Sequence, residues 1–225
     1  MNAFNRLSLG AALAVAAILL LPQSQGQVLE VSNLSAPNNG AGELPGTDAW
    51  WAQSFTMPAG GTTELFDVGV KLAREPIQFS GDFTISLWSS TGSGTPPLAR
   101  LGNIVAGQPV GSVTTEFVDY TFAAPAGLTL APNTSYFVVM EANVPSANSG
   151  LYWGRTQDAN PGNDGPGTVG GFTKSVNSGS SWDAFLDPSS PFQFEVTAVP
   201  EPRLIGLVAG MLLLGFGAFR RMRLR

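Results

Sequence analysis

Turn-forming residues interrupt the middle of this chain so often that a long regular element has no room there. Of the 225 residues, 27 are Gly and 17 are Pro, and only 12% are charged. Gly and Pro end helices and mark turns, and long solvated helices carry far more charge than this. The composition therefore predicts many short elements joined by turns, which is typical of an all-β protein.

The segments between the turn clusters have the two-residue period of β-strands. In 82–89, for example, apolar residues alternate with Thr84, Ser86 and Trp88. We expect strands at 50–57, 65–73, 82–89, 98–106, 116–123, 128–130, 135–142, 151–155, 171–176 and 192–199. Strands at this density, with no convincing helical stretch, predict one antiparallel β-sandwich or jelly roll that spans residues 27–198.

The residue types that are missing exclude most common catalytic designs. The chain has no Cys and no His, so it has no disulfide, thiolate nucleophile, histidine base or Cys/His zinc site. Residues 27–201 contain all 16 Asp and Glu but five Lys and Arg, a net charge of −11. A protein that binds the phosphate backbone of nucleic acid needs clustered Lys and Arg, so we expect no nucleic-acid partner. We also expect no catalytic residues and no resident metal.

Residues 1–26 have the layout of a secretory signal peptide. A positive charge at Arg6 precedes an apolar stretch at 7–21, and a polar bend ends at the small residue Gly26. We expect signal peptidase to cleave between Gly26 and Gln27 after export across the inner membrane. An uncleaved anchor or a buried helix is the alternative.

Residues 199–225 form a second membrane-directed segment. The uncharged run at 204–219 would span about 24 Å as a helix, and snorkelling arginines close the gap to the hydrocarbon thickness. Because no face of this run is polar, a transmembrane helix is expected. A basic cytoplasmic end follows it: Arg220, Arg221, Arg223 and Arg225. The basic end predicts that the acidic middle lies outside the inner membrane.

The tail begins with the sorting motif Val199, Pro200, Glu201 and Pro202. Together with the apolar run and the terminal arginines, this motif resembles the PEP-CTERM sorting tail of Gram-negative bacteria. The resemblance implies recognition by an exosortase, a membrane cysteine transpeptidase, and an association with exopolysaccharide and biofilm matrix at the cell surface. The two prolines also hold the backbone extended, which suits presentation to a processing enzyme. A retained stop-transfer anchor is the alternative.

The middle of the chain is similar to extracellular choice-of-anchor domains. The stretches that carry the similarity are 51–55, 83–88, 128–139 and 152–154. The resemblance implies an extracellular β-domain joined to an interchangeable sorting tail, and it implies no active residue.

Two groups of residues are candidate ligand contacts. Trp88 shares the face of its strand with Thr84 and Ser86, so alternation predicts that its ring faces solvent, where it could stack on sugar rings. A core aromatic is the alternative. A calcium loop is possible at Asp158, Asn160 and Asp164, although ordinary turn chemistry explains the same residues.

The remaining motifs indicate turns and surface carboxylates. The G-x-G-x-x-G run at 165–170 lacks the strand–turn–helix context of a dinucleotide site, so we interpret it as a turn. Glycoside hydrolysis needs two carboxylates at a defined distance across a cleft. The sequence does not give this distance for pairs such as Glu64 with Asp67, or Asp183 with Asp187. We therefore expect a non-enzymatic exported protein of the cell surface or matrix. The alternative is a carbohydrate-binding module or a cryptic polysaccharide hydrolase.

Overall fold

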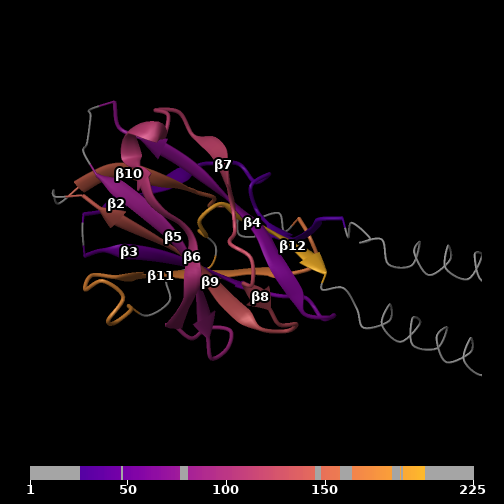
Figure 1. Cartoon of the computed structure of the whole chain (residues 1–225). Helices are drawn as coiled ribbons and strands as arrows, with labels where there is room; N and C mark the ends of the chain where they lie inside the picture. Colours follow the sequence, from indigo (N-terminus) through magenta and orange to yellow (C-terminus); the bar gives the residue numbers. More distant parts are fainter. Residues whose placement is uncertain are drawn as a thin grey trace, which may run out of the picture. The chain divides into compact units, whose positions relative to one another are not determined.

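The described part of the chain folds into two antiparallel β-sheets that pack as a sandwich (Figure 1). The computed structural model describes residues 26–46, 48–76, 81–144, 148–157, 164–183, 188 and 190–200. The expected all-β sandwich is confirmed. The expected helices of the signal peptide and of the membrane run at 204–219 lie outside these residues. Within them, no helix is long and apolar enough to cross a membrane.

The larger sheet has seven strands. Its main path follows the order β1-β12-β4-β10-β2, and β7 and β8 also pair with β4. The bounds are β1 Val28–Ser32, β2 Gly40–Pro45, β4 Thr63–Arg74, β7 Val118–Ala123, β8 Thr129–Leu130, β10 Asn148–Arg155 and β12 Phe194–Pro200. The first and last strands are therefore neighbours in one sheet, although they lie at opposite ends of the sequence.

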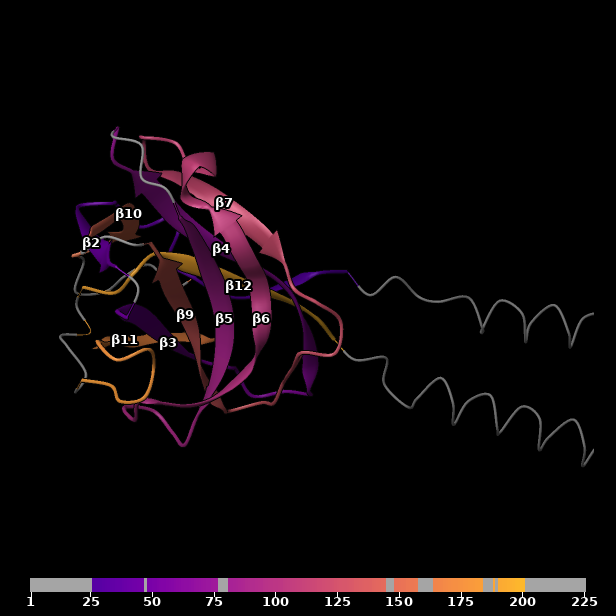
Figure 2. The ribbon, with the colours of Figure 1, turned by 60° about the vertical axis from the view of Figure 1, so that its left-hand side comes forward.

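The smaller sheet has five strands in the order β11-β3-β9-β5-β6. The bounds are β3 Trp50–Thr56, β5 Asp82–Ser90, β6 Pro97–Pro109, β9 Ser135–Asn143 and β11 Thr168–Ser175. Figure 2 shows β9, β5 and β6 side by side along this sheet. The β3–β9 pair runs in unbroken register from Trp50 opposite Glu141 to Thr56 opposite Ser135, so the faces of these two strands follow from simple alternation.

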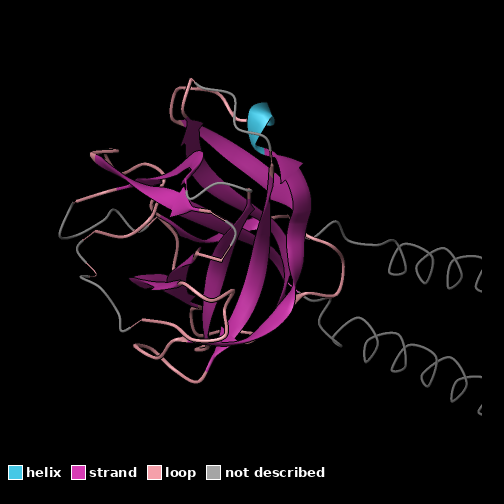
Figure 3. Ribbon diagram, turned by 90° about the vertical axis from the view of Figure 1, so that its left-hand side faces the viewer, coloured by secondary structure: helices cyan, strands magenta, loops and turns pink. Residues whose placement is uncertain are grey.

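Each of the expected strands is present, with bounds that differ by a few residues. Two strands, β1 and β2, were not predicted. The sequence of β2, Gly40 to Pro45, contains two glycines and ends in proline, so it lacks the alternation that marks a strand. Its pairing with β10 supplies what the local sequence does not. Within the described residues, helical structure is limited to the short 3₁₀ turn Val110–Ser112 (Figure 3).

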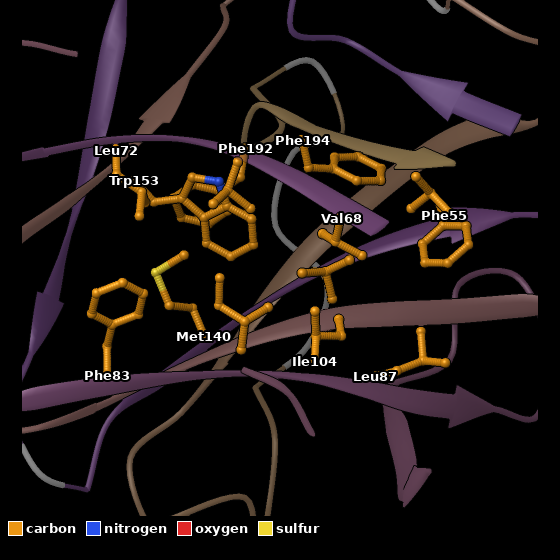
Figure 4. Packing of buried hydrophobic residues seen from close by; sticks show 14 of the residues in the cluster. Phe55, Val68, Leu72, Phe83, Leu87, Ile104, Met140, Trp153, Phe192 and Phe194 are labelled. Atoms are coloured by element: carbon orange, nitrogen blue, oxygen red, sulfur yellow. The ribbon is translucent and has the colours of Figure 1, made fainter. Parts of the chain in front are cut away.

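The main core lies between the two sheets and is rich in aromatic rings (Figure 4). Trp153 of β10 stacks on Phe192 with ring centroids 4.6 Å apart and planes inclined by 22°. The Nε1–H of Trp153 donates to the main-chain oxygen of Gln193 at 2.9 Å, so this indole donor is paired although the ring is buried. Each fully buried ring of this kind stabilises the fold by about 2–3 kcal/mol through loss of apolar surface to water.

Buried amides join the two sheets. The Oε1 of Gln53, on the core side of β3, accepts from the main-chain N–H of Phe192 at 2.8 Å, and its Nε2 donates to the main-chain oxygen of Gly170 at 2.7 Å. Gln53 is fully buried. A buried amide with both ends bonded fixes the strands that it touches, because breaking either bond leaves an unpaired polar group.

Candidate functional site

Three tryptophans gather on the outer face of the five-stranded sheet, which is turned away from the main core. We call Trp50, Trp88 and Trp182 the tryptophan cluster. The ring centroids of Trp50 and Trp88 lie 6.1 Å apart and those of Trp88 and Trp182 lie 5.8 Å apart, both edge to face. Beneath the cluster lie three fully buried side chains, Ala52, Phe137 and Val139. This part of the outer face is therefore a second hydrophobic cluster.

The prediction that Trp88 faces solvent was wrong. Trp88 lies on the expected face of β5, but it is only 9% exposed. The segment after β11 folds back over this face and brings Trp182 against it. Gly179 in that segment has φ +78°, and a Cβ there would lie 2.5 Å from the ring of Trp50, so glycine makes the close approach possible. Little of the Trp88 ring is therefore free to stack on sugars.

An ion pair borders the tryptophan cluster. Arg100 of β6 and Glu141 of β9 form a salt bridge of 2.5 Å, and the hydroxyl of Ser86 donates to the same carboxylate oxygen at 2.6 Å. The guanidinium of Arg100 lies 5.4 Å from the ring centroid of Trp50 and 5.5 Å from that of Trp88. Cation–π contact and the ion pair together hold Arg100 as a cover over the two rings.

The expected sorting motif begins at the end of the last strand. β12 ends at Pro200, and Glu201 and Pro202 lie outside the described residues, as do the terminal arginines. Ala198 of β12 pairs with Val28 of β1, and Val28 is two residues beyond the expected signal-peptide cleavage point. The two positions expected to be processed thus adjoin a single pair of strands in the larger sheet.

The possible calcium loop is described only at its end. Asp158 and Asn160 lie outside the described residues. The main-chain N–H of Asp164 donates to the oxygen of Ser32 at 2.8 Å, and its carboxylate accepts a hydrogen bond from Ser35. Within the described residues, no group of three or more acidic side chains is placed to hold a metal ion. Asp164 here closes a loop against β1.

The glycine-rich run at 165–170 leads into a strand. The main-chain N–H of Gly167 donates to the oxygen of Glu30 at 2.7 Å, and β11 begins at Thr168. A Cβ at Gly167 would lie 2.8 Å from that oxygen, so the small residue permits the contact with β1. The interpretation of this run as a turn therefore holds for residues 165–167, whereas residues 168–170 already belong to β11.

The acidic pairs singled out in the sequence are used in local contacts. Glu64 accepts from the main-chain N–H of Gly127 at 2.6 Å, and Asp67 accepts from the hydroxyl of Thr197. Asp183 pairs with Lys174 at 3.7 Å, and Asp187 lies outside the described residues.

A different pair of carboxylates, which the sequence did not indicate, meets at a tyrosine. The hydroxyl of Tyr152 donates to Glu75 Oε1 at 2.5 Å, and Tyr152 lies opposite Glu43 in the β10–β2 register. The hydrogen bond to Glu75, with burial and the charges of both carboxylates, raises the pKa of Tyr152 to about 12. Burial and the charge of Glu75 raise the pKa of Glu43. The phenol therefore stays a donor at neutral pH and serves to hold the carboxylate.

The comparisons with known proteins add no relative to these observations. No protein-family model matches the chain, and no curated protein or solved structure is significantly similar to it.

Proposed function

We propose that this chain is an exported, non-enzymatic protein of the bacterial cell surface or extracellular matrix. Residues 1–26 direct export and are removed by signal peptidase, and residues 199–225 are a sorting tail that an exosortase processes. The domain in between, a sandwich of the jelly-roll kind, is presented outside the inner membrane and associates with exopolysaccharide. The observation that carries the proposal is the tail: the Pro200-Glu201-Pro202 motif, the apolar run and the terminal arginines at one end of the chain.

The pairing of the first and last strands supports this proposal. Val28 lies opposite Ala198 in the larger sheet, so the chain enters and leaves the sandwich at neighbouring strands. Figure 1 shows the start of β1 and the end of β12 on the same side of the domain. A domain with this arrangement is held from one edge while its tail is in the membrane.

The absence of histidine and cysteine supports a role without catalysis. Proton transfer would have to use carboxylates, lysine or hydroxyls, and the carboxylates of Glu64, Asp67, Glu75 and Glu141 are engaged in hydrogen bonds or ion pairs with neighbouring segments. The net charge of −11 between residues 27 and 201 repels anionic polymers at low salt. Divalent cations could bridge such a surface to acidic polysaccharide.

The test is the mass of the mature protein. The chain is expressed in a bacterium with an exosortase and in an isogenic strain without it, and surface and inner-membrane fractions are analysed by intact-mass spectrometry. We expect a surface species that begins at Gln27 and ends near Pro200–Pro202, with an uncleaved tail in the strain that lacks the enzyme. A double variant, Pro200→Ala with Pro202→Ala, should accumulate in the membrane. A main surface species that still ends at Arg225 would contradict the proposal.

A further inference from the structure

A small hollow lies on the outer face of the five-stranded sheet, where the hairpin between β5 and β6 faces the start of β11. Its volume is about 270 Å³, just below the range of about 300–1,000 Å³ that holds drug-sized ligands. The lining residues are Ser54, Thr56, Gly92, Ser93, Gly94, Ser135, Gly170, Gly171 and Pro188. The hollow has room for one small ring rather than for an extended chain.

Strand register explains the floor of the hollow. Ser54 and Thr56 are two residues apart on β3, so they share its outer face. Ser135 of β9 lies directly opposite Thr56. Three hydroxyl groups are thereby brought together on one patch of sheet.

A glycine pair forms one wall. The β3–β11 register shifts between Val169 and Phe172, so Gly170 and Gly171 form an irregular stretch opposite Ser54. A Cβ at Gly170 would lie 2.2 Å from Ser54 Oγ, which places the backbone itself against the floor. The carbonyls of this pair are held by the protein, since Gln53 Nε2 donates to Gly170 and Ser54 Oγ donates to Gly171, both at 2.7 Å.

The floor keeps unused hydrogen-bonding capacity of both kinds. The hydroxyls of Thr56 and Ser135 are 2.9 Å apart, and one of them donates to the other. Since each hydroxyl has one hydrogen and two lone pairs, this bond leaves one hydrogen and several lone pairs for a ligand. The hydroxyl of Ser54 donates its hydrogen to the main-chain oxygen of Gly171, so its lone pairs can still accept a hydrogen bond. A matching ligand must therefore both donate and accept through small neutral groups.

Among the residues that the structure describes, the lining carries no charge, although the domain as a whole is acidic. All of the described lining residues are Ser, Thr, Gly or Pro. An anionic ligand would find no cation in the lining to pair with, and burying an unpaired charge is costly. The Cα groups of the glycines and the ring of Pro188 supply apolar surface beside the hydroxyls. Alternating C–H and O–H groups on one ring are the chemistry of a neutral sugar.

We propose that this hollow binds one pyranose ring of a neutral glycan. The site differs from the stacking platform expected at Trp88, because its contacts are the Ser54, Thr56 and Ser135 hydroxyls and the glycine backbone. Binding should be weak, on the order of millimolar, because a small open site anchors few groups. The proposal goes beyond export and sorting, and the hollow exists whether the tail is cleaved or retained.

The test is saturation-transfer-difference NMR on the full chain, which reports weak binding. The protein is purified in a detergent without sugar headgroups and mixed separately with glucose, galactose, mannose, N-acetylglucosamine, glucuronate and glycerol. We expect transfer to at least one neutral sugar and much less to glucuronate and glycerol.

Two variants locate the binding. A Cβ at Gly92 meets nothing within 4 Å, so Gly92→Trp places a large side chain at the rim without displacing packed atoms, and it should lower the signal by about tenfold or more. Gly111 is equally unobstructed but lies beyond the other end of β6, so Gly111→Trp is the matched control and should bind normally. Thr56→Val keeps the shape of the side chain, removes one hydroxyl and should weaken binding several-fold.

Three outcomes would overturn the proposal. The first is no transfer to any neutral sugar, and the second is glucuronate or glycerol bound as well as the best hexose. The third is full binding by both Gly92→Trp and Thr56→Val, which would place the sugar elsewhere. Thermal unfolding of each variant shows that loss of binding is not loss of fold. A failed sorting experiment would leave these outcomes unaffected, so the two proposals are tested separately.

Discussion

The side chain of Asn33 forms two buried hydrogen bonds that join the two ends of the domain. Its Nδ2 donates to the main-chain oxygen of Phe192 at 3.0 Å, and its Oδ1 accepts from the main-chain N–H of Phe194 at 2.8 Å. All three residues are fully buried. The carboxamide thus continues the pairing of β1 with β12 beyond the end of β1. Asn33→Ala removes both bonds and leaves two backbone groups without partners.

The expected cost follows from those two groups. An unsatisfied buried donor or acceptor destabilises the folded state by about 1–3 kcal/mol, so two of them cost about 2–6 kcal/mol before relaxation. Water that enters the space left by the carboxamide offsets part of this. We expect the free energy of unfolding to fall by about 3 kcal/mol. With a slope of about 2 kcal/mol per molar urea, the unfolding midpoint should fall by about 1.5 M.

Urea unfolding of the Gln27–Val199 unit, followed by tryptophan fluorescence and far-UV circular dichroism, measures this midpoint. Asn103→Ala is the matched control, because Asn103 is exposed and its side chain bonds only to Arg100, at 3.2 Å, among the contacts described for it. Its free energy of unfolding should change by about 0.5 kcal/mol or less. If Asn33→Ala unfolds at the same urea concentration as Asn103→Ala, the buried bonds do not stabilise the fold as reasoned.

Three further predictions concern packing, pH and the tryptophan cluster. Gly42→Ala should lower stability by about 1–3 kcal/mol, because its Cβ would lie 2.5 Å from the ring of buried Phe192; Gly61→Ala, with nothing within 4 Å, is the control, and equal urea midpoints would contradict the reasoning. Burial, with the nearby charges of Asp67, Asp119 and Asp164, raises the pKa of Glu195 above 4.5 despite a hydrogen bond from Ser32. The folded state therefore binds the proton of this carboxyl more tightly than the unfolded state does. The stability that the bound proton contributes is lost as pH rises from 4.5 through the raised pKa. Glu195→Gln should therefore be more stable than the parent chain at pH about 7 and less dependent on pH below it, and urea midpoints that show no gain at neutral pH would refute this. Arg100→Ala should shift tryptophan emission to longer wavelength and cost about 1 kcal/mol, since it uncovers Trp50 and Trp88; an unchanged emission spectrum would show that Arg100 does not shield the rings.

Local pattern was sufficient for most of the strands. In β5 the side chains of Phe83, Ile85 and Leu87 are fully buried, as alternation required. The same reasoning failed for β2, because its two glycines and terminal proline carry no period. Strand β2 exists because β10 provides its hydrogen-bonding partners, and that pairing joins segments about a hundred residues apart.

The two-residue alternation of side chains also determined which face of β5 carries Trp88, but it did not determine what covers that face. A strand pattern assigns a side chain to one of two surfaces, whereas its exposure depends on what packs there. The cover consists of Trp182 and Arg100, and the return of the chain after β11 depends on the contact of Gly179 with Trp50. These residues are distant in sequence, so no local pattern predicts their meeting.

Composition and the two ends of the chain determined, without any structure, the all-β class and the expectation of export and sorting. The absence of histidine and cysteine likewise excluded whole classes of chemistry. Only the tertiary structure decided that Val28 lies beside Ala198, that Asn33 and Gln53 bond to the backbone around Phe192, and that Thr56 and Ser135 meet at the hollow. Each of these contacts depends on strand order and register, which are set by the packing of the whole sandwich rather than by the residues adjacent in the chain.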